Sequence, residues 1–143
     1  MSRRVLIVGG GVVGSACAFF LAAKHGLRAT VIERDPTYRR ASSALSASSI
    51  RQQFSTEINI RLSQASLEFY RRVGDELEVG GERPDIGLVE RGYLFLATAA
   101  GAGILSANHA VQRSCGVHAS LMSPSALAER FPWLNVGDIA AGS

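Results

Sequence analysis

The sequence is poor in the residues that mark several common classes of protein. Its two cysteines, Cys17 and Cys115, are far apart and form no C-x-x-C pair, which argues against a disulfide scaffold and a cysteine metal site. Only one of the fifteen basic residues is lysine, the net charge is +3, and no basic stripe alternates with aromatic residues. A nucleic-acid surface would show such a stripe. There is also no internal repeat and no G-x-S-x-G motif of hydrolases.

Charge is missing altogether from residues 5–23, which follow Arg3 and Arg4. Such a run superficially resembles a signal peptide or a membrane span. It holds four glycines, however, and its apolar pattern changes period halfway, so membrane association is not indicated. We expect a cytoplasmic protein whose two cysteines are reduced and at least partly buried. A chain of 143 residues with 47% hydrophobic content suffices for about one domain.

A dinucleotide-binding motif opens the chain. Residues 5–8 (VLIV) predict a central parallel strand buried on both faces. Gly9, Gly11 and Gly14 then match the G-x-G-x-x-G pattern. The first glycine permits the tight turn, the second leaves room for a pyrophosphate, and the third lets the following helix lie close to the strand.

The elements after the glycines agree with that motif. The helix is predicted to end near His25, where Gly26 can adopt the left-handed C-cap conformation. Its first turn offers free N–H groups to a diphosphate. Residues 29–32 predict a second strand, and Glu33 follows Gly14 by nineteen residues, the spacing of an acid that binds an adenosine ribose. A carboxylate there disfavours a 2′-phosphate. We therefore predict that the loop binds an adenine dinucleotide. The alternative interpretation is a tight turn that binds no ligand.

The motif alone does not choose between FAD and NAD. A plain NAD dehydrogenase would lead soon into another helix and a third strand, whereas here Pro36 interrupts the chain. The segment ASSALSASS at residues 41–49 follows, and then IRQQF at residues 50–54. Taken alone, the serine- and alanine-rich segment is also typical of a flexible linker.

These segments resemble a known family. The ERD of residues 33–35, ASSALSASS, IRQQFSTEINIRLS at residues 50–63, GYLFLAT at 92–98 and FPWLN at 131–135 are similar to the amine-oxidising flavoproteins. This superfamily contains D-amino-acid oxidase, sarcosine oxidase and glycine oxidase. The resemblance covers essentially the whole chain and implies a Rossmann-like, GR2-type FAD-binding βαβ unit followed by the start of an α+β substrate domain.

The resemblance implies a role for each matching position. The glycines and the first helical turn would receive the FAD pyrophosphate, and Glu33 would hold the ribose. Ser42 and Ser43 would lie near the pyrophosphate. Ser48 and Ser49 would lie near the ribityl chain and the flavin. Arg51 falls close to a basic residue that some members place against the isoalloxazine ring, and it is the one catalytic candidate. Many relatives have glycines near Ser48 and Ser49, so the flavin contacts here depart from the family pattern. The implied FAD-binding residues are Gly9, Gly11, Val12, Val13, Gly14, Glu33, Arg34, Ser42, Ser43, Ser48 and Ser49.

The rest of the chain has no second nucleotide signature. We predict residues 1–80 as part of the FAD domain, 81–135 as the start of the substrate domain, and 136–143 as a return toward the FAD domain. No carboxylate or cysteine pattern surrounds the three histidines, so we expect structural or surface roles for them and no metal site. The elements predicted here are a helix at 56–78, a hairpin of strands 86–90 and 93–97, a helix at 99–114, a strand at 119–122 and a helix capped by Ser123.

The resemblance implies an FAD-dependent oxidoreductase acting on an amine or amino acid by hydride transfer to flavin. Its members are more than twice this length, so the chain is expected to be an N-terminal fragment whose substrate-contacting residues lie mostly beyond Ser143. The alternatives are an NAD-dependent dehydrogenase and a non-catalytic dinucleotide-binding module. The sequence leaves the amine, the electron acceptor (oxygen, a quinone or a partner flavoprotein) and covalent attachment of the flavin open.

Overall fold

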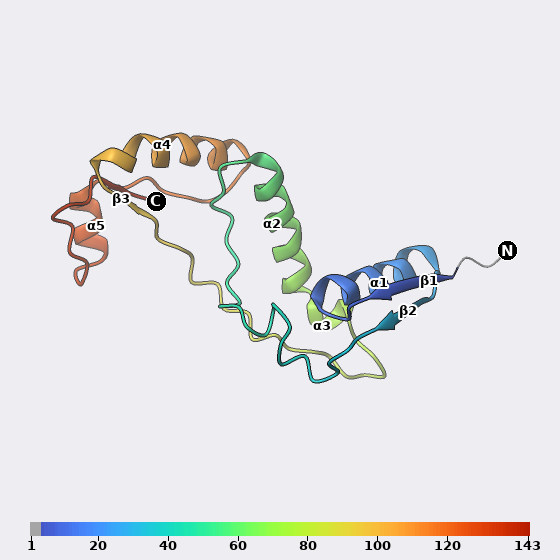
Figure 1. The fold of residues 1–143 in the computed structure, drawn as a ribbon. Coiled ribbons are helices and arrows are strands. Elements are labelled where there is room, and N and C mark those ends of the chain that lie inside the picture. The colour runs from blue at the N-terminus through green and yellow to red at the C-terminus, as the bar shows by residue number, and fades with distance from the viewer. Residues whose placement is uncertain (1–3) are drawn as a thin grey trace. The chain divides into compact units, whose positions relative to one another are not determined.

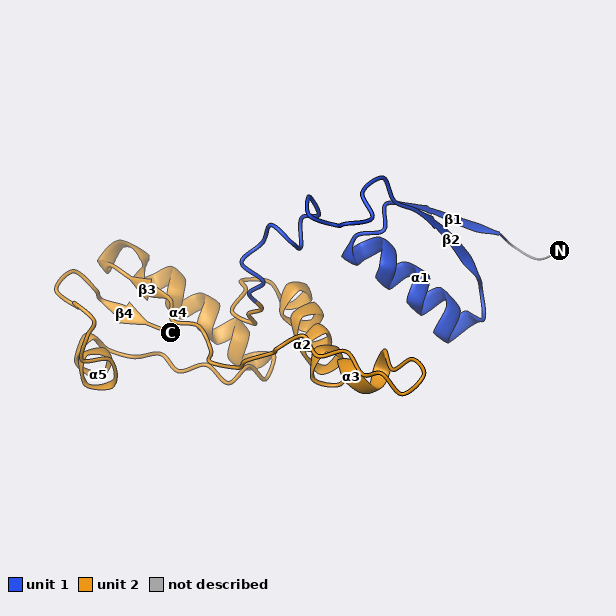
Figure 2. Cartoon of the chain, turned by 90° about the horizontal axis from the view of Figure 1, so that it is seen from below, with its two compact units in different colours: residues 1–49 blue, residues 50–143 orange. Residues whose placement is uncertain are grey.

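The computed structural model describes residues 4–143, and the chain divides into two compact units, residues 1–49 and residues 50–143 (Figure 2). This division follows the contacts within the chain and differs from the predicted boundary after residue 80. The assignment of FAD and substrate domains stays a prediction.

The first unit is the predicted βαβ element. Strand β1 (Val5–Val8), helix α1 (Val12–His25) and strand β2 (Ala29–Ile32) follow one another, and the two strands pair in parallel with Val5 opposite Ala29 (Figure 1). Gly26 adopts φ +61° and donates its N–H to the Ala22 carbonyl at 3.0 Å, which ends α1 as predicted.

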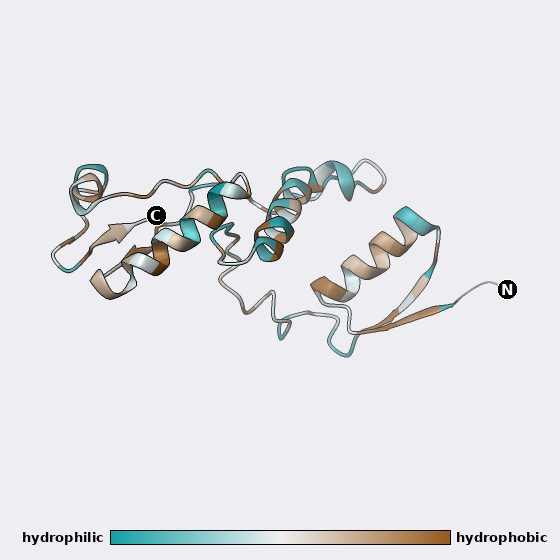
Figure 3. Ribbon diagram, turned by 90° about the horizontal axis from the view of Figure 1, so that it is seen from above, coloured by the Kyte–Doolittle hydropathy of each residue, from teal (hydrophilic) through white to brown (hydrophobic). Residues whose placement is uncertain are grey.

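The first unit is more exposed than the sequence predicts. Strand β1 was expected to be buried on both faces, but it has one neighbouring strand and Val8 is 84% exposed. No residue of α1 is fully buried, and Cys17 is exposed, against the expected burial. Both elements are hydrophobic until the last turn of α1, where Lys24 and His25 lie (Figure 3). A two-stranded sheet and one helix are too few elements to bury the apolar faces of β1 and α1. Within residues 4–143 no helix is long and apolar enough to cross a bilayer.

The second unit is mainly helical. Its small core consists of Ile60, Cys115 and Val117, with Phe54 and Val111 among the side chains packed against it. The elements are α2 (Glu57–Arg71), α3 (Val73–Glu76), β3 (Leu96–Ala97), α4 (Ala99–Ser114), α5 (Pro124–Arg130) and β4 (Ala141–Gly142). Helices α4 and α5 confirm the predictions, including the Ser123 hydroxyl that accepts the Ala126 N–H.

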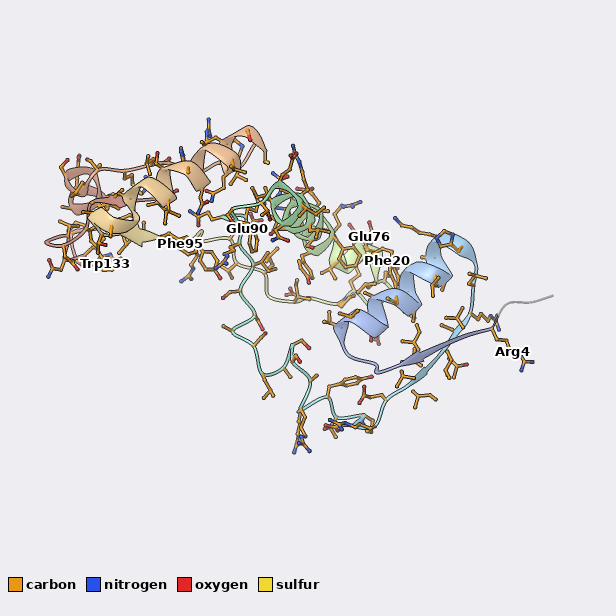
Figure 4. The ribbon with its side chains drawn as sticks, turned by 45° about the horizontal axis from the view of Figure 1, so that its top comes forward. Arg4, Phe20, Glu76, Glu90, Phe95 and Trp133 are labelled. Atoms are coloured by element: carbon orange, nitrogen blue, oxygen red, sulfur yellow. The ribbon has the colours of Figure 1, made fainter. Side chains whose placement is uncertain are left out.

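Two predictions for residues 56–97 are wrong. The helix expected at 56–78 is broken at Arg72, whose φ of −111° and ψ of 11° separate α2 from α3. The hairpin of strands 86–90 and 93–97 does not form, because Gly87 and Gly92 adopt left-handed φ and the Glu90 carboxylate accepts two hydrogen bonds from Arg71 of α2, at 2.7 and 2.8 Å. Figure 4 labels Glu90. That doubly hydrogen-bonded pair raises the pKa of Arg71 and lowers the pKa of Glu90.

The third incorrect element is the strand at 119–122. Only Met122 makes a bridge, to Gly142, which also pairs with Leu96 of β3. The Ala119 N–H instead donates to the Val117 carbonyl, and the Ala119 carbonyl contacts His109 Nε2 at 3.1 Å. These local contacts keep residues 119–121 from continuing the sheet.

The core of the second unit predicts a contrast between two isoleucines of α2. Ile60 is fully buried, whereas Ile58 is 65% exposed. Replacement Ile60→Ala should lower the free energy of unfolding by about 2–5 kcal/mol, because it removes buried methylene groups and leaves a cavity. Replacement Ile58→Ala should cost less than about 1 kcal/mol. Denaturant unfolding of the full-length protein measures both, and equal losses would contradict the described core.

Candidate functional site

The glycine loop between β1 and α1 brings helix and strand into close contact. Gly9 has φ +98° and donates its N–H to the Ile32 carbonyl at 2.8 Å, so the turn is tied to the end of β2. A Cβ atom on Gly14 would lie 1.9 Å from the Gly9 carbonyl oxygen and 3.2 Å from Ile7 Cγ2. No side chain fits at position 14, which is the third-glycine role that the motif predicts.

The first turn of α1 is open to a ligand. Gly11 is the N-cap residue, with no side-chain hydrogen bond to cap the helix and no acidic residue in the first turn. The first N–H groups of a helix have no intrahelical partner and carry a partial positive charge. A Cβ built on Gly11 meets nothing within 4 Å, so the space above this glycine is free of protein atoms among residues 4–143. The loop has the room and the donors that a pyrophosphate needs.

Glu33 is held against this loop from the end of β2. Its Oε1 accepts the Asp35 N–H at 2.9 Å and its Oε2 accepts the Gly10 N–H at 2.7 Å. These hydrogen bonds, that of Asp35 first, hold the pKa of Glu33 below its ordinary value. A carboxylate has about four lone-pair sites, so each oxygen keeps capacity for a further donor. Glu33 is therefore fixed, ionised and still able to accept hydrogen bonds from a ribose.

The residue after Glu33 adds a positive charge without an ion pair. Arg34 is exposed, and within the described chain no carboxylate lies within ion-pair distance of its guanidinium. Asp35 instead binds Thr37, accepting its N–H at 3.0 Å and its hydroxyl at 2.6 Å, which lowers the pKa of Asp35. The Asp35–Thr37 contact shapes the turn that leaves β2.

The serines predicted near the cofactor lie in a series of exposed turns. The Leu45 N–H donates to the Ala41 carbonyl at 3.1 Å, and Ser46 Oγ donates to the Ser43 carbonyl at 2.8 Å. Ser48 has φ +48°, a left-handed conformation that glycine adopts more readily than serine does. Ser42, Ser43, Ser48 and Ser49 are exposed in the same unit as the glycine loop, and their cofactor contacts stay predictions.

Arg51, the catalytic candidate, belongs to the second unit. Its guanidinium lies over the rings of Phe54 and Phe95, at 4.8 and 5.3 Å from their centroids, and Ser63 donates its hydroxyl to the Arg51 carbonyl. No carboxylate among residues 4–143 pairs with it. Arg51 borders a cavity of about 240 Å³ with Gln112, which is nine-tenths buried and donates to the Phe54 carbonyl. The structure gives Arg51 a fixed aromatic setting; a catalytic role stays a prediction.

The structure thus gathers Gly9, Gly11, Gly14 and Glu33 of the predicted set at one end of the first unit. Sequence reasoning missed Tyr38, whose hydroxyl reaches the same loop. The signal that could have found it is weak, because only the Pro36 turn hints that the chain folds back. Residues 4–143 hold no group of three histidine, cysteine or acidic side chains that could bind a metal ion.

Comparison with known proteins identifies similar chains. The family model described as DAO, FAD dependent oxidoreductase, matches residues 4–143. A protein named FAD-dependent oxidoreductase domain-containing protein 1 is 47% identical in Xenopus laevis and 43% identical in Bos taurus, each over 97% of this chain. The sarcosine oxidase subunit beta of an Arthrobacter species is 28% identical over 96% of this chain. The chain spans 29%, 30% and 33% of the length of these three relatives.

A solved structure supports the fold. The crystal structure of L-proline dehydrogenase from P. horikoshii superimposes with a TM-score of 0.75 and 28% identity, covering 99% of this chain and 36% of that chain. Together with the βαβ unit described above, this likeness confirms the predicted α/β class with a Rossmann-like FAD-binding start.

The contacts of Glu33 predict a pH-dependent contribution to stability. A carboxylate whose pKa is lowered on folding stabilises the protein fully above its unfolded pKa, here near 4.5, and this contribution disappears as pH falls through the folded pKa. Replacement Glu33→Gln should therefore lower the thermal unfolding midpoint at pH 7. The midpoints of variant and parent should converge at acidic pH.

The control is Glu129→Gln, since Glu129 is an exposed glutamate of α5 with no hydrogen-bond partner among the described residues. It should leave the midpoint unchanged at both pH values. A gap between Glu33→Gln and the parent that stays constant with pH would contradict the role given to the ionised carboxylate.

Proposed function

The chain belongs to the DAO family of FAD-dependent oxidoreductases, and from this premise we propose that the protein oxidises a C–N bond of an amino acid or of a secondary or N-methylated amine. The observation that carries the cofactor part of the proposal is the glycine loop with its open first helical turn and its fixed carboxylate. The amine part is supported by two similar proteins whose names contain sarcosine and L-proline, both secondary amino acids.

The residues present fit the cofactor. Gly11 leaves space for a pyrophosphate, the N–H groups of Val12 and Val13 in the first turn of α1 offer donors, and Glu33 retains acceptor capacity for a ribose. FAD, when bound, supplies a two-electron acceptor for the reaction. The first unit would bind and orient its adenosine half, and Ser42, Ser43, Ser48 and Ser49 are proposed to follow the cofactor toward the flavin.

Bound FAD would accept two electrons from the substrate, and an external electron acceptor would take them from the cofactor. The substrate would lose a hydride equivalent from its α-carbon while the nitrogen lone pair forms the C=N bond. The imine would then take up water and split into a carbonyl compound and an amine or ammonia. Arg51 is proposed to lie near the flavin, where its guanidinium would supply a positive charge. Reoxidation of the cofactor by oxygen, a quinone or a partner flavoprotein would complete the cycle. A cytoplasmic location of the protein is a separate proposal.

Two other functions predict different behaviour. An NAD-dependent dehydrogenase would bind nicotinamide nucleotide and show no flavin absorbance. A non-catalytic module would bind FAD without turnover. The decisive experiment purifies the full-length protein, records its visible spectrum, and titrates it without oxygen against sarcosine, L-proline and a panel of D-amino acids. We expect a flavin spectrum that bleaches with at least one of these amines. A protein without flavin, or a flavin that no amine reduces, would contradict the proposal.

Two glycines of the loop give a matched pair of variants. Replacement Gly11→Ala should leave the unfolding midpoint of the cofactor-free protein unchanged, because its methyl group enters open space and φ is −62°. It should weaken FAD binding by about tenfold or more, because the methyl group occupies the place of the pyrophosphate.

Replacement Gly14→Ala, in contrast, should first of all lower the stability of the cofactor-free protein. Its methyl group would lie 1.9 Å from the Gly9 carbonyl oxygen, so α1 must move away from β1 at a cost of about 1–3 kcal/mol in folding. Thermal unfolding of the FAD-free protein and fluorescence titration with FAD measure the two effects. Weak FAD binding without a loss of stability in Gly14→Ala, or full FAD affinity in Gly11→Ala, would contradict this assignment of roles.

A further inference from the structure

Tyr38 has a backbone conformation that aromatic residues rarely adopt. Its φ is +56°, and among residues 4–143 only Tyr38 and Ser48 combine a side chain with such a left-handed φ. Bulky residues occur in this region when surrounding contacts hold them there, often at functional sites. The conformation turns the chain back after β2, so that the tyrosine hydroxyl lies near the glycine loop of the same unit.

Local hydrogen bonds hold the turn in place. The Tyr38 N–H donates to the Asp35 carbonyl at 3.0 Å, and the Tyr38 carbonyl accepts the Ala41 N–H at 3.0 Å. The Asp35 carboxylate binds both the N–H and the hydroxyl of Thr37. Residues 35–41 therefore form a defined turn that fixes where the tyrosine ring points.

The ring ends against the middle glycine of the loop. A Cβ built on Gly10 would lie 3.1 Å from Tyr38 Oη and 3.2 Å from Glu33 Cβ, so the tyrosine hydroxyl and the glutamate side chain both lie close to the bare Cα of Gly10. The Gly10 N–H is also the donor to Glu33 Oε2 at 2.7 Å. Tyr38 is 44% exposed, and its hydroxyl has no hydrogen-bond partner within the described residues. A donor and acceptor without a protein partner among the described residues thus lies close to Gly10, the glycine whose N–H the Glu33 carboxylate accepts.

We propose that Tyr38 is a second contact for the adenosine half of the dinucleotide, after Glu33, and that its hydroxyl hydrogen-bonds the ribose. This inference rests on the proposed FAD-binding function. The two side chains are chemically complementary, because an ionised Glu33 only accepts hydrogen bonds whereas the Tyr38 hydroxyl can also donate one. A ribose, whose hydroxyls both donate and accept, uses the two together.

The test compares Tyr38→Phe with Tyr93→Phe in the full-length protein. Tyr93 is a matched control because it is 42% exposed and lies in the second unit, stacked on Phe95. The probes are FAD and ADP, which share the adenosine half, and their dissociation constants are measured on cofactor-free protein by flavin fluorescence and by competition. Tyr38→Phe should weaken both ligands by the same factor, about three- to tenfold, as the loss of one hydrogen bond predicts.

The unfolding midpoint of cofactor-free Tyr38→Phe should equal that of the parent, because the deleted hydroxyl has no partner within residues 4–143. Tyr93→Phe should change neither affinity. Three results would overturn the inference while FAD binding stands. They are unchanged affinities in Tyr38→Phe, a weaker affinity for FAD but not for ADP, and an unfolding midpoint of cofactor-free Tyr38→Phe below that of the parent. A parent protein that binds neither FAD nor ADP would overturn the proposed function as well.

Discussion

The close approach of α1 to β1 is the constraint on which the described site depends. It exists because position 14 has no side chain: the Gly9 carbonyl oxygen occupies the place where a Cβ would be. The contact brings the start of the helix to the end of the strand, so the unpaired N–H groups of the first turn face the same open space as Gly11. A longer separation would leave the glycine loop without the helix whose partial charge makes it an anion site.

Glu33 links the second strand to that arrangement. By accepting the Gly10 N–H it ties β2 to the loop, and by accepting the Asp35 N–H it is fixed in one orientation. The same hydrogen bonds lower its pKa, so the group that would receive a ribose is already ionised and aligned before any ligand binds. The parallel register that sets Val8 opposite Ile32 brings this carboxylate level with the loop.

Local patterns were enough for the first unit and for the well-capped helices. The glycine spacing, the aliphatic strands, the Gly26 C-cap, and Ser123 followed by Pro124 each act through neighbours a few residues away. The sheet of the second unit was not predictable in this way, because β3 pairs with β4 more than forty residues later in the sequence. The pairing of Glu90 with Arg71 of α2 likewise joins residues far apart in the sequence. The position of Tyr38 near the glycine loop was not predicted, because it depends on a left-handed φ that no pattern in the sequence indicates.

We propose the glycine loop and Glu33 as the site of the FAD pyrophosphate and adenosine. A crystal structure of the full-length protein grown with FAD tests this most directly. We expect pyrophosphate oxygens within hydrogen-bond distance of the N–H groups at the start of α1, and ribose hydroxyls that donate to the Glu33 carboxylate. FAD bound away from this loop, or bound with its ribose out of reach of Glu33, would contradict it.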